Sequence, residues 1–266
     1  VNDMWRTLPR KAEKASEEKE QRRFPEEPQE NLLYFIEKNA PLLEPWQREI
    51  VRIVRKVAQY FYPQRQTQVM NEGWATFWHH KLLNTMYDDG HLTDGVMIEW
   101  LKSHTNVVYQ HPGANLNPYA LGFAMYTDIK RICDNPTEED RRWFPDLAGT
   151  PWLPSLSHAM RNFKDESFIG QYLSPKLMRD FRMFAIHDDE KKTELEVAAI
   201  HDDAGYRRVR EALSRQYDLG SREPNIQVWN VNLRGDRSLT LRHFQHNGRP
   251  LHDSGQEVLK HVARLW

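Results

Sequence analysis

"VMNEGWATFWHHKLLNTMY", residues 69–87, is the stretch that decides the fold of this chain. It is apolar on nearly all sides of a helix, a pattern that predicts a buried helix. Glu72 stands in it next to several aromatic residues, although acidic side chains are seldom fully buried without a partner. Three roles are therefore open to Glu72: an ion pair with an arginine of residues 48–55, a cap on a neighbouring backbone, or a metal ligand.

Gly73 bears on that choice. A glycine inside a buried helix costs roughly 1 kcal/mol relative to alanine. Such a glycine is usually kept because another backbone or a ligand approaches closely. Gly73 therefore predicts close contact between this helix and either a second helix or a bound group.

His79 lies on the same helix face as Glu72, whereas His80 points about 80° away. Seven residues separate Glu72 from His79, a rise of about 10.5 Å, while natural helical ligand pairs are three or four residues apart. We therefore expect His79 to support a site or face a substrate, with Asn71 in the same supporting role. Glu72 as a metal ligand would need partners from another helix.

The flanking sequence is mostly helical. Residues 46–61 repeat apolar side chains at three- and four-residue steps, which predicts an amphipathic helix with Pro45 in its first turn and Pro63 at its end. Thr93 is the expected N-cap of the next helix. Further helices are predicted over residues 93–105, 117–134, 137–149 and 155–173.

The pattern changes near residue 178. Two strands, a helix, a hairpin and a last helix are predicted in turn over residues 179–189, 194–203, 205–218, 225–244 and 254–266. The repeated "AIHDD" at 185–189 and 199–203 has two interpretations, an Asp/His metal pair or two strand ends, with Asp202 or Asp203 capping the following helix.

The expected fold class is therefore α+β. A large, mostly helical body (31–177) follows a charged connector (1–30) and precedes a small α+β module with antiparallel strands (178–266).

Composition narrows the function classes. Thirty-seven basic and 38 acidic residues leave a net charge of −1, which gives no electrostatic reason to expect nucleic-acid or anionic-lipid partners. No apolar run approaches the roughly 18 residues of a membrane span. The single cysteine, Cys133, excludes an internal disulfide and fits a reducing cytoplasm, so we expect a cytoplasmic protein. From the charge balance and the apolar runs we expect neither nucleic-acid nor membrane partners. A start at Val1 without methionine predicts a piece of a longer protein.

Several segments together resemble the SpoVR family, the stage V sporulation protein R-like proteins of bacteria. They are "MWRTLPRK", "PQENLLYFIEKNAPLLEPWQREI", "YFYPQRQTQVMNEGWATFWHH", "SHTNVVYQHPG", "NPYALGFAMYTDIKRICDNPTEED" and "EPNIQVWNVNLRGDRSLTLRH". The resemblance covers nearly the whole chain. It implies the C-terminal portion of a family member that lacks its N-terminal region, and a link to sporulation, the spore cortex and peptidoglycan.

A second resemblance concerns mechanism. "NEGWA" is similar to the downstream glutamate helix of gluzincin-type zinc metallopeptidases, and "NPYALGFAMY" to the helix that faces the substrate in such enzymes. The resemblance implies Glu72 as a metal ligand and Tyr119 as a donor to an oxyanion, with His104 or His79 orienting. The implied cofactor is zinc or another divalent transition metal. The upstream H-x-x-x-H that would supply two ligands is absent from this sequence, and that pattern lacks the general base of H-E-x-x-H.

Two functions follow from these resemblances. The first is a metal-holding regulator on a metallopeptidase-like scaffold, whose partners are other proteins such as cell-wall enzymes. The second is an active metal-dependent hydrolase of peptide or amide bonds, so whether the protein is an enzyme stays open. The helix that carries Glu72 would face the absent region, so we expect this fragment to expose apolar surface and to self-associate.

Overall fold

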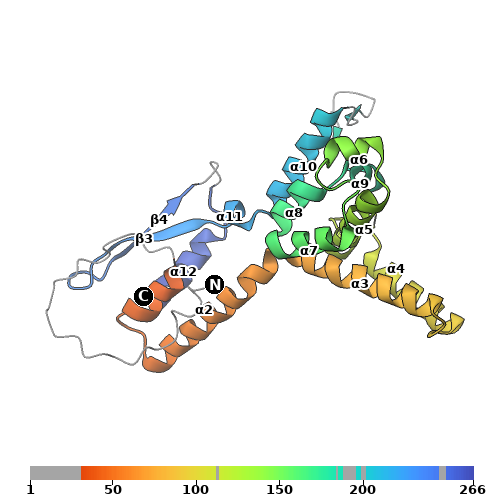
Figure 1. The fold of residues 1–266 in the computed structure, drawn as a ribbon. Helices are drawn as coiled ribbons and strands as arrows, with labels where there is room; N and C mark the ends of the chain where they lie inside the picture. Colours follow the sequence, from red (N-terminus) through yellow and green to blue (C-terminus); the bar gives the residue numbers. More distant parts are fainter. Residues whose placement is uncertain (1–30, 112–113, 184, 188–195, 199–201, 246–249) are drawn as a thin grey trace, which may run out of the picture. The chain divides into compact units, whose positions relative to one another are not determined.

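The structure is a computed structural model that describes residues 31–111, 114–183, 185–187, 196–198, 202–245 and 250–266 (Figure 1). The expected charged connector, residues 1–30, lies outside them. The helices are α1 (Leu32–Asn39), α2 (Pro45–Arg65), α3 (Gln68–Asp88), α4 (Asp94–Val108), α5 (Pro118–Asp134), α6 (Glu138–Trp143), α7 (Trp152–Asn162), α8 (Asp165–Tyr172), α9 (Pro175–Asp180), α10 (Asp203–Tyr217), α11 (Leu219–Arg222) and α12 (Gly255–Leu265). The strands are β1 (Ala185–His187), β2 (Glu196–Ala198), β3 (Asn225–Val231) and β4 (Leu239–Phe244).

The α+β class expected from the sequence is confirmed. The described residues are mainly helical, and β1 pairs with β2 and β3 with β4, both antiparallel. None of the helices among the described residues is both long and apolar enough to cross a membrane.

The chain forms two compact units. One contains residues 1–52 and 225–266, and the other residues 53–224. The boundaries of these units differ from those expected from the sequence. The helical unit continues beyond residue 177 because α10 packs on α8. The division into domains expected from the sequence, at residues 1–30, 31–177 and 178–266, stays a prediction.

In the first unit, α1 packs against the β3–β4 hairpin. Phe35, Val228 and Val231 are buried there. The C-terminal Trp266 stacks on Phe35, with ring centroids 5.8 Å apart, and its indole Nε1 donates to the carbonyl of Arg237 at 2.6 Å.

In the helical unit, α3 and α5 form the centre of the core. Their buried side chains, among them Met70, Phe77, Met125 and Tyr126, belong to one hydrophobic cluster with residues of the later helices. One face of α3 stays in water, since Ala75, His79, Leu82 and Met86 are exposed. The prediction that this helix is buried on nearly all sides was therefore wrong for that face.

Local capping signals in the sequence are confirmed. Thr93 accepts a hydrogen bond from the Val96 amide at the start of α4, and Asp202 accepts one from the Gly205 amide at the start of α10, at 2.6 Å. The second "AIHDD" therefore ends in a helix cap, as one of its two interpretations predicted.

Three of the helix predictions differ from the structure. The helix expected over 137–149 already ends at Trp143. α2 continues through Pro63 to Arg65, because a proline in the last turn removes one amide without breaking the preceding turns. The helix expected over 155–173 is interrupted at Phe163, which is extended, and α8 starts anew at Asp165. This break allows the Asp165 carboxylate to bind a distant helix, as described next.

Candidate functional site

Glu72 and Tyr119 form a carboxylate–phenol pair between α3 and α5. Both side chains are half-buried. A hydrogen bond with Glu72 is the main reason that the pKa of the Tyr119 phenol lies above its ordinary value, followed by burial and the carboxylate charge. Tyr119 itself is held at the start of α5, where its amide donates to the Asn117 side chain at 3.0 Å. The two residues that the metallopeptidase resemblance singled out thus meet.

Two glycines explain why the pair can form. A Cβ added at Gly73 would lie 2.4 Å from Cα of Gly122, and one added at Gly122 would lie 2.2 Å from the carbonyl oxygen of Val69. α3 and α5 therefore touch backbone to backbone directly beside Glu72. Of the two reasons that the sequence allowed for Gly73, approach of another backbone is confirmed.

Asp165 fixes the start of the helix that carries Glu72. Its carboxylate oxygens accept hydrogen bonds from the amides of Val69 and Met70, each at 2.9 Å. The side chain is 1% exposed, and this burial raises its pKa to about 6 although the backbone hydrogen bonds lower it. Sequence reasoning missed Asp165, because its partners lie about a hundred residues earlier and no local signal marks the pairing.

Asn71 and His79 make hydrogen bonds with residues other than Glu72. The Asn71 amide donates to the hydroxyl of Thr67 at 2.9 Å, within the first turn of α3. Nδ1 of His79 accepts a hydrogen bond from the Trp100 indole at 3.4 Å. Their expected supporting role at Glu72 stays a prediction.

His104 belongs to a separate cluster of rings. It lies 5.1 Å from His80, 5.3 Å from Trp100 and 4.9 Å from Phe123, measured between ring centroids. It is 8% exposed, and its Nε2 atom is buried without a hydrogen-bond partner. Burial, and then the neighbouring His80 and His79, lower the pKa of His104 and so favour its neutral form.

His80 is a residue of this cluster that sequence reasoning passed over. Its pKa is lowered by burial as well. The signal was present, since a residue 80° away from Glu72 on α3 must face a different neighbour, and that neighbour is α4.

A complete metal site is not formed by the described residues, among which no three His, Cys, Asp or Glu side chains gather in a metal-holding group. Glu72 offers one carboxylate, hydrogen-bonded to Tyr119. The described residues therefore do not by themselves fit the implied zinc or other divalent metal.

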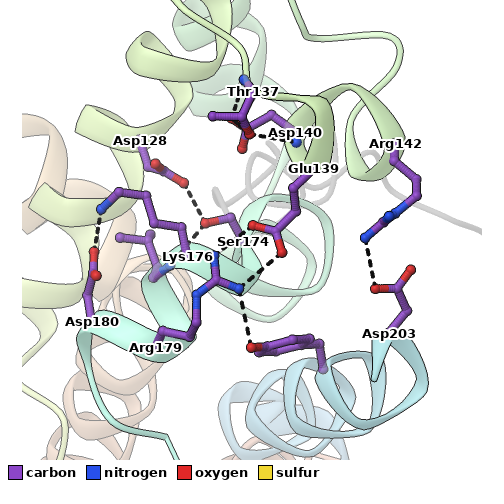
Figure 2. Close-up of polar contacts among 12 residues, drawn as sticks. Asp128, Thr137, Glu139, Asp140, Arg142, Ser174, Lys176, Arg179, Asp180 and Asp203 are labelled. Atoms are coloured by element: carbon purple, nitrogen blue, oxygen red, sulfur yellow. Dashed lines mark hydrogen bonds and ion pairs between the residues drawn. The ribbon is translucent and has the colours of Figure 1, made fainter. Parts of the chain in front are cut away.

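A second polar centre ties α5 to α6 and α9. Arg131 donates from Nε to Asp128 at 2.7 Å and from both terminal nitrogens to Asp140, at 2.7 and 2.8 Å. Figure 2 shows Asp128 also accepting from the Ser174 hydroxyl, at 2.6 Å, and Asp140 paired with Thr137. These buried carboxylates have partners on α5, α6 and at the start of α9, so the cluster joins the three helices.

A cavity of about 520 Å³ lies at the proline- and tryptophan-rich junction between α6 and α8. Its lining includes Trp143, Pro151, His158 and Tyr172. None of the candidate site residues lines it, so the cavity is distinct from the Glu72–Tyr119 pair.

These features define a class: a mainly helical α+β protein with a half-buried carboxylate–phenol pair at a close helix crossing. The chain belongs to the SpoVR family. The family model described as SpoVR like protein matches residues 1–222, and the model described as SpoVR-like C-terminal domain matches residues 224–266.

A curated relative agrees with this assignment. The chain is similar to the uncharacterized protein YcgB of Escherichia coli (strain K12), with 64% identity over 271 residues that cover 100% of this chain and 53% of the relative. The chain thus spans about half the length of that relative. No solved structure matches it.

Proposed function

We propose that the protein is a regulatory member of the SpoVR family, linked to sporulation and cell-wall processes, whose Glu72–Tyr119 pair is one side of a metal site. The observation that carries the proposal is the close crossing of α3 and α5 at Gly73 and Gly122, beside which the Glu72 carboxylate and the Tyr119 phenol interact. A phenol that donates to a carboxylate holds one oxygen in place and leaves the other lone pairs free to bind a cation. Zinc or another divalent transition metal would take its remaining ligands from outside the described residues.

The regulatory role is supported by the kinds of side chain that the site offers. The described residues supply one carboxylate, one phenol and, in a separate cluster, two histidines whose pKa values are lowered by burial. In this proposal Glu72 is a metal ligand and not a general base. A regulator in the cytoplasm would use this site to bind other proteins, such as cell-wall enzymes. Such binding needs no reactive group beyond these side chains.

Metal content of the full-length protein tests the proposal. The wild-type protein should carry about one zinc or other transition metal by mass spectrometry, and Glu72→Gln should lose it. Glu99→Gln, which changes an exposed glutamate of α4, is the matched control and should keep the metal. A wild-type protein without metal, or a Glu72→Gln protein that keeps it, would contradict the proposal.

The half-exposed phenol of Tyr119 favours a second function, a metal-dependent hydrolase of peptide or amide bonds. In that function Tyr119 would donate its proton to the oxyanion that forms on the substrate. Tyr119→Phe should then lower kcat of any peptide- or amide-cleaving activity by about 10²–10³ with little change in KM. An activity that Tyr119→Phe leaves unchanged would exclude this role.

A further inference from the structure

The hairpin of α3 and α4 carries an apolar surface without a partner. Figure 1 shows the second half of α3 and α4 extending away from α6 to α10 within the helical unit. On α3 the exposed residues Ala75, His79, Leu82 and Met86 follow one another at three- and four-residue steps, so they share a face. Leu82 is 55% exposed.

α4 also carries exposed apolar side chains. Its buried residues Met97, Trp100 and His104 face the rest of the helical unit. Ile98 and Leu101, three residues apart on a neighbouring face, are 67% and 41% exposed. We call these exposed side chains of α3 and α4 the hairpin surface.

The distribution of exposed apolar side chains is uneven. Among the described residues of the helical unit, the large exposed apolar side chains lie on α2, from Ile53 to Phe61, and on or just after α3 and α4, from Leu82 to Tyr109, with Leu153 as the exception. The helices α5 to α10 bury theirs in the common core. Contiguous exposed apolar surface on a protein marks an interaction site.

We propose that the hairpin surface is covered by the half of a family-length chain that lies outside these residues. The relative has about twice the length of this chain, since the match covers 53% of it. That relative therefore contains a further stretch, about as long as this chain, that has no counterpart among these residues. An occupant of that size is long enough to form a domain with its own core.

The geometry also places the Glu72–Tyr119 pair at one end of this surface. Glu72 precedes Ala75 and His79 on the same side of α3. A segment that packs along the exposed face of α3 therefore runs beside Glu72. This inference concerns packing and stands whether or not a metal binds.

Thiol labelling of a single introduced cysteine tests the proposal. Ile98→Cys is made in this chain and in the family-length protein that contains it, and each is labelled with a maleimide at low micromolar concentration. The native Cys133 is buried and gives a low background. We expect labelling at residue 98 to be ~10-fold or more slower in the family-length protein, because a covered thiol reacts only when the interface opens.

Leu153→Cys is the matched control, since Leu153 is exposed on α7, away from the hairpin surface. It should react equally fast in both proteins. Hydrogen exchange of α4 in the unmodified proteins gives the same comparison without a substitution, and slower exchange in the family-length protein is expected.

Two results would overturn the proposal. Equal labelling of Ile98→Cys in both proteins, with equal hydrogen exchange, would show that the hairpin surface stays open to solvent. Protection that appears in this chain as its concentration rises, and is no greater in the family-length protein, would identify a second copy as the occupant. Neither result depends on metal content, so failure here is distinguishable from failure of the proposed metal site.

Discussion

At the scale of single residues, two glycines determine how the candidate site is built. Gly73 and Gly122 let α3 and α5 approach so closely that a side chain at either position would overlap backbone atoms. The close approach brings Glu72 to Tyr119. The packing of α3 on α5 and the candidate site therefore depend on the same two glycines.

Replacing either glycine by alanine should destabilise the protein. The added Cβ would meet backbone atoms at 2.2–2.4 Å, which cannot move aside as a flexible side chain can, so we expect the free energy of unfolding to fall by about 1–3 kcal/mol. Urea denaturation measures this. Gly95→Ala is the control, because nothing lies within 4 Å of its added Cβ; it should be neutral or gain up to about 1 kcal/mol. Equal effects at the three positions would argue against the close crossing.

The pKa of Tyr119 reports directly on the Glu72 pair. A carboxylate that accepts from a phenol favours its protonated form, so Glu72→Gln should lower the pKa of Tyr119 toward its ordinary value. NMR of carbon-labelled tyrosine over a pH titration measures this, with Tyr119→Phe to assign the signal.

A second pair in the same chain supplies the control. Tyr87 donates to Asp94 at 2.9 Å, and this hydrogen bond raises the pKa of Tyr87. Asp94→Asn should therefore lower the pKa of Tyr87 and leave that of Tyr119 unchanged. A Tyr119 signal that ignores Glu72→Gln would mean that the pair does not form in solution.

At the scale of secondary-structure elements, buried ionic groups join helices that the hydrophobic core does not orient by itself. Arg131 of α5 binds Asp140 of α6, and Asp128 of α5 accepts from Ser174 at the start of α9. Asp165 of α8 caps α3 in the same manner. Each such group satisfies a helix end or a buried charge, so removing one partner leaves the other exposed to a desolvation cost.

Arg131→Met should be strongly destabilising. It would leave Asp128 and Asp140, both 3% exposed at their side chains, without their cation, at a cost of about 3–5 kcal/mol in the free energy of unfolding. The matched control is Arg215→Met, which removes an exposed ion pair with Glu211 and should change stability by less than about 1 kcal/mol. Comparable losses in the two variants would show that the Arg131 cluster is not a tie between helices.

Acid should weaken the same cluster. Burial alone would raise the pKa of Asp140, but the hydrogen bonds from Arg131 and Thr137 outweigh it and lower the pKa to about 2. An unfolded aspartate has a pKa of about 3.9, so this contribution is present above about pH 4 and is lost as the pH falls toward 2. Unfolding measured over this range should show a steeper loss in the wild type than in Arg131→Met. Parallel curves would contradict the assignment.

At the scale of the whole molecule, apolar side chains are buried in one part of the helical unit and exposed in another. The helices α5 to α10 share one core, whereas α3 and α4 leave large apolar side chains in water. The relative that the chain matches is about twice as long as the chain itself.

This chain by itself should self-associate. Exposed apolar side chains on the hairpin surface gain free energy when they are removed from water, and in the absence of the other half of the family-length protein a second copy can cover them. Light scattering should give a mass that rises with concentration for this chain and a constant mass for the family-length protein. Ile98→Glu should reduce the association of this chain. A monodisperse monomer in both proteins would contradict the prediction.

The sequence by itself determined the local structure. Apolar repeats at three- and four-residue steps predicted α2, the apolar stretch 69–87 predicted α3, and a hairpin was predicted where β3 and β4 pair. Thr93 was expected as a cap, and Asp202 as one of two candidate caps. These features depend on interactions between residues a few positions apart, which a sequence shows directly.

The tertiary structure alone decided the pairing of Glu72 with Tyr119, the identity of Gly122 as the partner of Gly73, and the use of Asp165 as a cap for α3. The break before α8 and the exposed face of α3 were likewise decided by the tertiary structure alone. All of these depend on residues far apart in the chain, whose contacts are set by how whole helices pack. One-dimensional periodicity shows which face of a helix is apolar, but not which neighbour covers it.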